Sequence, residues 1–388
     1  MPTAVLRDES HGVLKELEEG GITSTMITGD SVLTGVCIAR ESGMIKKNKK
    51  VILGQKASDI EIEWVDFDTD AIEDKPSIDL LGKSGSAVDI ALTGEAWSML
   101  LQNDPKYATM ISKHVRVFGR CKPGDKVSVV ATFVANGYRT LMCGDGQNDC
   151  GSLKTAHVGI SLSTSEASLV APFTSTDNAI TSVTEVLREG RCAIASALAA
   201  YSFYILYGQI ESFIQVIAAY LSVTFYEWCW VYFDAIWSIS LAFSLPLSKA
   251  ASRLTLRQPT DSLLGAETLF SVCGILGWNF IFLVIAMLSL WSQDWFSCRK
   301  WNSDDVSNVL TIGDNYESSL LFIMGGFQIV ATSMVLNYGY TFRQGWWRNY
   351  IFVALSIMWM LFVFVMTIHP SKFSCIFRVN CINEVRLG

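Results

Sequence analysis

Two aspartates and an asparagine follow a short apolar segment near the middle of the chain. Asp145, Asn148 and Asp149 lie in the sequence Gly-Asp-Gly-Gln-Asn-Asp, directly after the apolar, β-prone residues 138–143. This pattern predicts a buried parallel strand that ends at the carboxylates, at the sheet edge where open α/β folds bind ligands. Mg²⁺ prefers oxygen ligands and shares its shell with water and phosphate. We therefore predict that Asp145 and Asp149 bind a metal and that Asn148 donates to a phosphoryl oxygen. The alternative is a turn that is rich in Gly, Asp and Asn for conformational reasons alone.

A second polar turn follows another predicted strand, over residues 22–27. Thr28, Gly29 and Asp30 come next, and a helix is predicted over residues 31–39. A threonine hydroxyl and the free N–H groups of a helix N-terminus can bind an anion. The same residues also occur as a simple helix cap, so this turn predicts a phosphate site only in combination with the first one.

A lysine begins a third predicted helix, over residues 127–135. Lys126 closes the sequence Arg-Cys-Lys-Pro-Gly-Asp-Lys, where its ammonium could reach an anion at the sheet edge. Strands and helices alternate through this half, which predicts a Rossmann-like α/β domain with a parallel sheet. Residues 46–90 lack periodicity, and we expect the lysine cluster at 46–50 and the acidic stretch at 59–74 to be surface excursions without chemistry.

The remaining half has the composition of a membrane protein. Half of the 388 residues are apolar, and the mean hydropathy is +0.32. A spanning helix needs about 20 apolar residues, and five segments qualify. They are 195–222, 228–247, 269–291, 319–338 and 350–368. The net charge of −7 comes without long runs of one sign, so nucleic acid is not an expected partner and membrane lipid is.

The charges of the loops predict an orientation. Basic residues follow the second and fourth segments, whereas the 292–316 loop is acidic. The positive-inside rule then places the α/β domain and the basic loops in the cytosol. The basic residues are Lys249, Arg253, Arg257, Arg343 and Arg348, and the loop charges are Asp294, Arg299, Lys300, Asp304, Asp305 and Asp314.

Carboxylates inside the predicted spans indicate a substrate site, because charges there are costly. Asp234 lies within the second span and Glu227 precedes it by two helical turns, so a regular helix would place both on one face. Glu211 and Gln215 form an i, i+4 pair in the first span. Tyr220 belongs to a crowd of aromatic residues here, and carboxylates with aromatic faces between them suit an elongated organic cation. The alternative is that Glu227 and the aromatic residues form an interfacial belt.

The motifs together resemble those of the P-type ATPases. Met142-Cys-Gly-Asp-Gly-Gln-Asn-Asp149 resembles the hinge motif of that family, Met26-Ile-Thr-Gly-Asp30 its phosphate-gripping motif, and Arg120, Pro123 and Lys126 its Arg-x-x-Pro-x-x-Lys motif. The sequence from Cys150 to Ser175 resembles the fifth class, and within it the B branch of lysosomal or vacuolar polyamine transporters.

The resemblance implies a fold and a set of roles. It implies an α/β, haloacid-dehalogenase-like phosphorylation domain over 1–192, an all-α bundle of five transmembrane helices over 193–370, and a truncated exoplasmic tail over 371–388. Thr28, Gly29, Asp30, Lys126 and Asn148 would bind ATP and the transferred phosphoryl group, with Mg²⁺ on Asp145 and Asp149. Acidic residues occupy the positions of Asp234 and Glu227 in the polyamine branch, and Tyr220 matches with one residue gapped. A polyamine or a related organic cation would be bound by Asp234, Glu227, Gln215 and Tyr220.

One expected residue is absent from the sequence. The family's phosphorylated aspartate lies in Asp-Lys-Thr-Gly-Thr, whereas Asp-Lys occurs here only at Asp74-Lys75 and Asp125-Lys126, neither followed by Thr. We therefore expect a carboxyl-terminal fragment of a pump or an inactive, decayed copy. The A branch of transmembrane-helix dislocases and a soluble phosphatase remain as alternatives.

Overall fold

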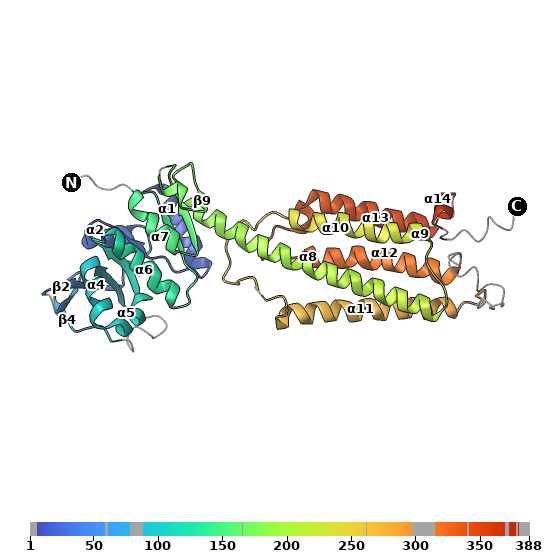
Figure 1. Cartoon of the computed structure of the whole chain (residues 1–388), viewed down its shortest axis with the longest axis horizontal. Helices are drawn as coiled ribbons and strands as arrows, with labels where there is room; N and C mark the ends of the chain where they lie inside the picture. Colours follow the sequence, from blue (N-terminus) through green and yellow to red (C-terminus); the bar gives the residue numbers. More distant parts are fainter. Residues whose placement is uncertain are drawn as a thin grey trace. The chain divides into compact units, whose positions relative to one another are not determined.

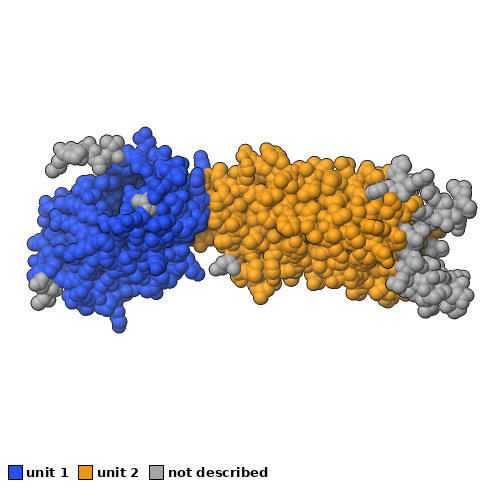
Figure 2. Space-filling view, turned by 45° about the horizontal axis from the view of Figure 1, so that its top comes forward, with its two compact units in different colours: residues 1–187, 253–256 blue, residues 188–252, 257–388 orange. Residues whose placement is uncertain are grey.

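The computed structural model describes residues 6–58, 61–77, 88–164, 166–260, 262–296, 315–339, 341–368, 372–377 and 379. The chain divides into two compact units, coloured in Figure 2. Unit 1 comprises residues 1–187 and 253–256, and unit 2 comprises residues 188–252 and 257–388.

A six-stranded mixed sheet forms the larger part of unit 1. Its strand order is β1-β6-β5-β2-β3-β4, and the first four of these strands are parallel whereas β3 and β4 pair antiparallel. Figure 1 labels two of its strands, β2 and β4. The strands are β1 (Met26–Ile27), β2 (Lys50–Lys56), β3 (Ile62–Asp66), β4 (Ile72–Glu73), β5 (Val88–Thr93) and β6 (Val115–Gly119).

The described part of the acidic stretch 59–74 corrects the expectation of a surface excursion, because it forms β3 and β4, and Trp64 of β3 is buried. A further strand, β2, follows the lysine cluster and was not predicted. Val51, Ile52 and Leu53 of β2 are buried, and β2 pairs with β5 inside the sheet. A strand covered on both faces is a continuous apolar run without alternation, so the missing periodicity marked a buried strand. The following hairpin adds β3 and β4 antiparallel, and the six-stranded sheet is therefore mixed, where a wholly parallel one was expected.

Helices cover both faces of this sheet. Alternate residues of β5 point to opposite sides: Ile90 and Leu92 pack in one cluster with Trp97 of α4, and Ala91 packs in another with Val36 of α2. The helices of unit 1 are α1 (Asp8–Glu19), α2 (Val32–Glu41), α4 (Gly94–Asn103), α5 (Pro105–Ser112), α6 (Pro123–Ala135) and α7 (Cys150–Thr155), with the 3-10 turns η1 (Gln147–Asp149) and η2 (Glu166–Leu169).

A separate three-stranded parallel sheet carries the Gly-Asp-Gly-Gln-Asn-Asp turn. It contains β7 (Leu141–Gly144), β8 (Val158–Ser161) and β9 (Phe173–Thr174), with β8 in the middle. Among the described strands, β1 and β7 are each at the edge of their own sheet. The predicted parallel strand is thus present, but it is shorter than residues 138–143 and is shifted toward the turn.

A short segment far along the chain, Arg253–Leu256, belongs to unit 1. Leu254 is buried against Val13 and Leu17 of α1, and its backbone N–H donates to the Glu16 carboxylate at 3.1 Å. A Cβ on Gly20 would lie 2.9 Å from the Leu254 Cβ, so α1 must end on glycine for this packing.

Unit 2 is helical, and among the described residues five helices are long and apolar enough to cross a membrane. The five predicted segments thus form helices, and their crossing of a membrane stays a prediction. These helices are α8 (Thr181–Tyr220), the composite helix Glu227–Leu247, α11 (Ala266–Trp291), α12 (Tyr316–Asn337) and α13 (Tyr350–Ile368). The composite helix consists of α9 (Glu227–Val231), the π-helical η3 (Tyr232–Ser238), α10 (Ile239–Ser244) and η4 (Leu245–Leu247), and a short helix, α14 (Lys372–Ile376), follows α13.

Aromatic side chains fill the core of unit 2. Trp237 is fully buried between Phe233, Phe322 and Trp359. A Cβ on Gly326 would lie 2.4 Å from the Trp237 ring, so this close approach requires glycine. The predicted loop charges Arg299, Lys300, Asp304, Asp305 and Asp314, and most of the predicted tail over 371–388, lie outside the described residues.

Candidate functional site

A buried ion pair lies at the carboxyl end of β7. The Lys126 ammonium, in the first turn of α6, donates to the Asp149 carboxylate at 2.7 Å, and the two side chains are 12% and 10% exposed. Buried charges are stable only when paired and hydrogen-bonded. The structure therefore brings together the predicted phosphate-binding lysine and one of the two predicted metal ligands.

The turn after β7 fixes the position of Asp149. The Asp149 N–H bonds the Gly146 carbonyl at 3.0 Å, which closes a 3-10 turn, and α7 begins at the next residue. A Cβ on Gly144 would lie 2.7 Å from an Asp149 carboxylate oxygen. Glycine at position 144 thus lets the carboxylate fold back over the end of the strand.

Asp145 and Asn148 lie in the same turn and are exposed. The Asp145 carbonyl accepts from the Ser163 hydroxyl at 2.6 Å, and Gln147 is hydrogen-bonded to Glu166, so residues after β8 hold the turn in place. Among the described residues, no group of three or more His, Cys, Asp or Glu side chains is arranged to hold a metal. Two carboxylates nevertheless suit Mg²⁺, which is bound through one or two carboxylates plus water and substrate phosphate.

Burial changes the pKa of the Cys143 thiol, which lies beside these carboxylates. Burial, with the nearby charges of Asp145 and Asp149, raises the pKa of Cys143 to about 12. Cys143 is a free thiol in the structure. At neutral pH it is protonated and adds no charge to the turn.

The Thr28 turn is tied to the turn that leads into α6. The Thr28 N–H bonds the Phe118 carbonyl at 2.9 Å, the Cys121 N–H bonds the Thr28 carbonyl at 3.0 Å, and the Arg120 N–H bonds the Asp30 carbonyl at 2.7 Å. The Thr28 hydroxyl accepts from the Asp30 N–H at 3.1 Å and keeps its own hydrogen as a donor. A Cβ on Gly29 would approach no atom closer than the Cys121 carbonyl at 3.8 Å, so this side of the turn is open. Through the Arg120–Cys121 backbone, the Thr28 turn is thus connected to the helix that carries Lys126.

The predicted substrate residues of unit 2 lie on α8 and the composite helix. The Tyr207 hydroxyl donates to the Asp234 carboxylate, and the Gln215 amide is 3.5 Å from a Glu211 carboxylate oxygen. Tyr220 is 85% exposed. Glu227 is exposed in the first turn of α9.

Asp234 lies in the π-helical stretch of its span, which the sequence did not predict. A π-helix advances less per residue than an α-helix, and such stretches are frequent at functional sites. The argument that Glu227 and Asp234 share a face assumed a regular α-helix, so their common face stays a prediction. Sequence analysis also missed Tyr207, although its spacing of four residues from Glu211 was a signal.

These sites and the two-part fold define a class of protein. In the P-type ATPases, an α/β unit that carries a phosphate-binding turn is followed by a helical membrane unit. The chain is homologous to the P-type ATPases of the fifth class. This confirms the resemblance seen in the sequence motifs.

The chain is similar in sequence to several named ATPases. The chain is 28% identical to the human polyamine-transporting ATPase 13A3 over 97% of its length, and 29% identical to the human probable cation-transporting ATPase 13A4 over 91%. It is 26% identical to the vacuolar cation-transporting ATPase YPK9 of Saccharomyces cerevisiae over 90% of its length. The chain spans 34%, 32% and 24% of these three relatives, so about a third of the length of the first two. No protein-family model matches the chain.

Proposed function

We propose that the chain forms part of an ATP-driven P-type transporter that moves a polyamine or a related organic cation across an endomembrane. The observation that carries the proposal is the Lys126–Asp149 pair at the end of β7, in a chain that is homologous to such pumps over 97% of its length. The vacuolar name of one relative supports the choice of an endomembrane.

In this proposal unit 1 is part of a haloacid-dehalogenase-like phosphorylation domain. Phosphoryl transfer depends mainly on positioning and on neutralising the charge of the equatorial oxygens. The Thr28 hydroxyl and Gly29 N–H would bind the phosphoryl group, and Asp30 would lie on the nucleotide side. Lys126 and Asn148 would donate to phosphoryl oxygens. Bound Mg²⁺, held by Asp145 and Asp149, would supply the positive charge that joins the carboxylates to the phosphate.

The Lys126–Asp149 pair then has a second use. Lys126 pairs with Asp149 and compensates the charge of the buried carboxylate. In the proposed pump Lys126 would bind the phosphoryl group and Asp149 would hold Mg²⁺, whose positive charge would then compensate the carboxylate in place of the ammonium.

In unit 2 the organic cation would bind between α8 and the composite helix. Asp234, Glu227, Gln215 and Tyr220 are the proposed contacts, since carboxylates and aromatic rings both attract an ammonium group. By the positive-inside rule, the basic residues that follow the composite helix favour a cytosolic position for that end and for unit 1.

Expression of the complete locus of this chain, followed by assay of ATP hydrolysis, tests the proposal. We expect spermine to stimulate hydrolysis in the presence of Mg²⁺ and ATP, and Lys126→Ala and Asp149→Asn to abolish the stimulation. Glu267→Gln, which removes an exposed carboxylate paired with Arg257 at 3.1 Å, is a control that should behave like the wild type. Absence of stimulation by any amine in the wild-type protein would exclude the polyamine assignment.

A second candidate function follows from the missing motif. Phosphoenzyme formation requires a nucleophilic carboxylate, and the 388 residues contain no Asp-Lys-Thr-Gly-Thr. The chain by itself would then be a catalytically inactive membrane protein. Incubation with γ-³²P-ATP should leave this chain unlabelled after acid precipitation; acid-stable label would show that it is a complete enzyme.

A further inference from the structure

A short segment after α13 packs against the core of unit 2. Phe377, which follows α14 directly, is 3% exposed, and its ring meets the Tyr232 ring edge to face at a centroid distance of 4.7 Å. The Phe377 ring also lies 5.8 Å from the Phe362 ring and 6.5 Å from the Phe322 ring. Phe377 thus joins the composite helix, α12 and α13, and α14 lies at the same end of unit 2 as α9 (Figure 1). We call α14 together with Phe377 the strap.

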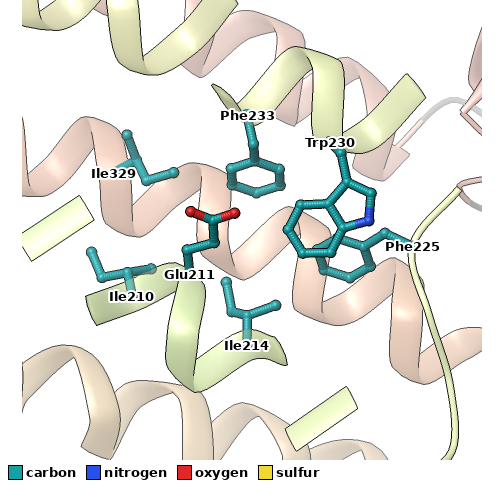
Figure 3. A pocket seen from close by; sticks show the side chains of 7 residues that line it. All are labelled: Ile210, Glu211, Ile214, Phe225, Trp230, Phe233 and Ile329. Atoms are coloured by element: carbon teal, nitrogen blue, oxygen red, sulfur yellow. The ribbon is translucent and has the colours of Figure 1, made fainter. Parts of the chain in front are cut away.

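The strap supports one wall of a pocket. Figure 3 shows this pocket, which is lined in part by the rings of Phe225 and Phe233. Phe322 packs against both rings, at centroid distances of 6.1 and 5.1 Å, and also against Phe377 of the strap. A single aromatic ring therefore separates the strap from the wall of the pocket.

Hydrogen bonds join the strap to α9. The N–H groups of Phe377 and Val379 both donate to the Ser374 carbonyl, at 3.1 Å each, which closes the end of α14. The Cys229 thiol of α9 donates to the Phe377 carbonyl at 3.4 Å, and Cys229 is 2% exposed. The accessibility of the Cys229 thiol therefore reports whether the strap is in place.

Cys375 lies in α14 and forms a disulfide. The four described cysteines of unit 1 are free thiols: Cys37, Cys121, Cys143 and Cys150. Disulfides persist in oxidising compartments and are rare in the cytosol. The proposed orientation, with unit 1 in the cytosol and the end of α13 on the other side of the membrane, agrees with this division of the cysteines.

We propose that the Cys375 disulfide holds the strap against the composite helix and α12, and that reduction of the disulfide releases the strap. A helix of five residues is not stable alone, and a cross-link limits the conformations of a released chain, so the disulfide shifts the strap toward its packed position. A dithiol that reduces the disulfide passes two electrons and two protons to the two cysteine sulfurs and closes to its own disulfide. An oxidising compartment would thereby keep this end of the composite helix covered. This dependence on the compartment rests on the proposed orientation, whereas the release of the strap rests on packing alone.

Alkylation of Cys229 tests the proposal, in the protein expressed from its complete locus and reconstituted in nanodiscs. N-ethylmaleimide is the probe, and mass spectrometry of peptides gives the rate of modification of each cysteine. After treatment with dithiothreitol and its removal, we expect Cys229 to be modified about tenfold faster or more than in the untreated protein, because local opening governs the reactivity of a buried group. Cys375→Ser should give the same fast modification without any reductant.

Controls separate release of the strap from general unfolding. Cys192 is buried near the opposite end of unit 2, where its thiol donates to the Ser248 carbonyl at 3.4 Å, and its modification should stay slow. Cys273→Ser removes an exposed free thiol from α11 and should leave Cys229 as slow as in the wild type. Equal acceleration at Cys192, or slow modification of Cys229 in both the reduced protein and Cys375→Ser, would overturn the proposal. Modification of Cys375 in the untreated protein would overturn it too, because it would show a free thiol. Stimulation of ATP hydrolysis by spermine tests the transport function separately.

Discussion

The Lys126 ammonium and the Asp149 carboxylate, on α6 and at the end of η1, form an ion pair 2.7 Å long in the interior of unit 1. Because both side chains are nearly buried, the pair differs from the other ion pairs of this unit, most of which are partly exposed to solvent. Removing one partner of a buried pair leaves an uncompensated charge, which costs more than the pair itself contributes.

Lys126→Ala should therefore destabilise unit 1 by about 3 to 5 kcal/mol, the cost of stranding a buried carboxylate. The free energy of unfolding of unit 1 can be measured by pulse proteolysis in urea. Lys46→Ala is the matched control, because Lys46 pairs with Glu18 at 3.6 Å with both side chains largely exposed. Such surface pairs contribute little, so equal losses in the two variants would contradict the assignment of a buried pair.

Magnesium should restore part of the unfolding free energy that Lys126→Ala loses with its ammonium group. A ligand that binds only the folded state stabilises it in proportion to the logarithm of its concentration, and Lys126→Ala removes the ammonium that pairs with the Asp149 carboxylate. Millimolar MgCl₂ should raise the unfolding free energy of Lys126→Ala more than that of the wild type. Adding Asp145→Asn should remove this gain. NaCl at equal ionic strength is the control, and a gain that NaCl reproduces would count against a metal site.

The partly buried thiol of Cys143, in β7, should be unreactive. Burial raises the pKa of Cys143 from 9.0 to about 12, and the thiolate is the reactive species. At pH 8 we expect iodoacetamide to modify Cys143 far more slowly than the exposed Cys37. Modification of both at the same rate would show that the strand end is open.

The same pKa shift predicts how stability changes with pH. A thiol whose pKa is higher in the folded than in the unfolded state stabilises the fold below pH 9, and this contribution is lost as the pH rises toward about 12. The decline of the unfolding free energy of unit 1 from pH 9 upward should therefore be less steep in Cys143→Ala. Parallel curves for the two proteins would contradict this.

Unit 2 should be sensitive to a single methyl group at one glycine. The Cβ of Gly326→Ala would lie 2.4 Å from the Trp237 ring and 3.0 Å from Val363, so the core must shift, at a cost of about 1 to 3 kcal/mol. Thermal unfolding in detergent should show a lower midpoint for this variant. Gly274→Ala on α11, where nothing lies within 4 Å, should keep or slightly raise the midpoint. A midpoint for Gly326→Ala as high as that for Gly274→Ala would mean that the helices separate without cost.

The sequence predicted those features that depend on residues close together in the chain. The helices of the five predicted spans follow from the length of apolar segments, and the turn at Asp145–Asp149 follows from its glycines and aspartates. The buried strand β2 was missed because a continuous apolar run after a lysine cluster lacks the alternation of an exposed strand.

Other features depend on contacts between distant parts of the chain. The Lys126–Asp149 pair joins two elements 23 residues apart, and no local pattern requires the lysine to point at that carboxylate. Tyr207 meets Asp234 only after α8 and the composite helix pack together. Pairing of this kind is decided by tertiary packing, so the chemistry of single residues could be predicted from the sequence but their partners could not.

The π-helical stretch at Tyr232–Ser238 has a consequence for how its span tolerates changes in length. A π turn accommodates an additional residue compared with an α turn, so deleting one residue there can leave an unbroken α-helix with both flanks still in register. A deletion in an ordinary α-helix rotates everything beyond it by about 100°. Asp234 thus lies in the section of Glu227–Leu247 where the chain can be shortened by one residue with the least disturbance to the helix on either side.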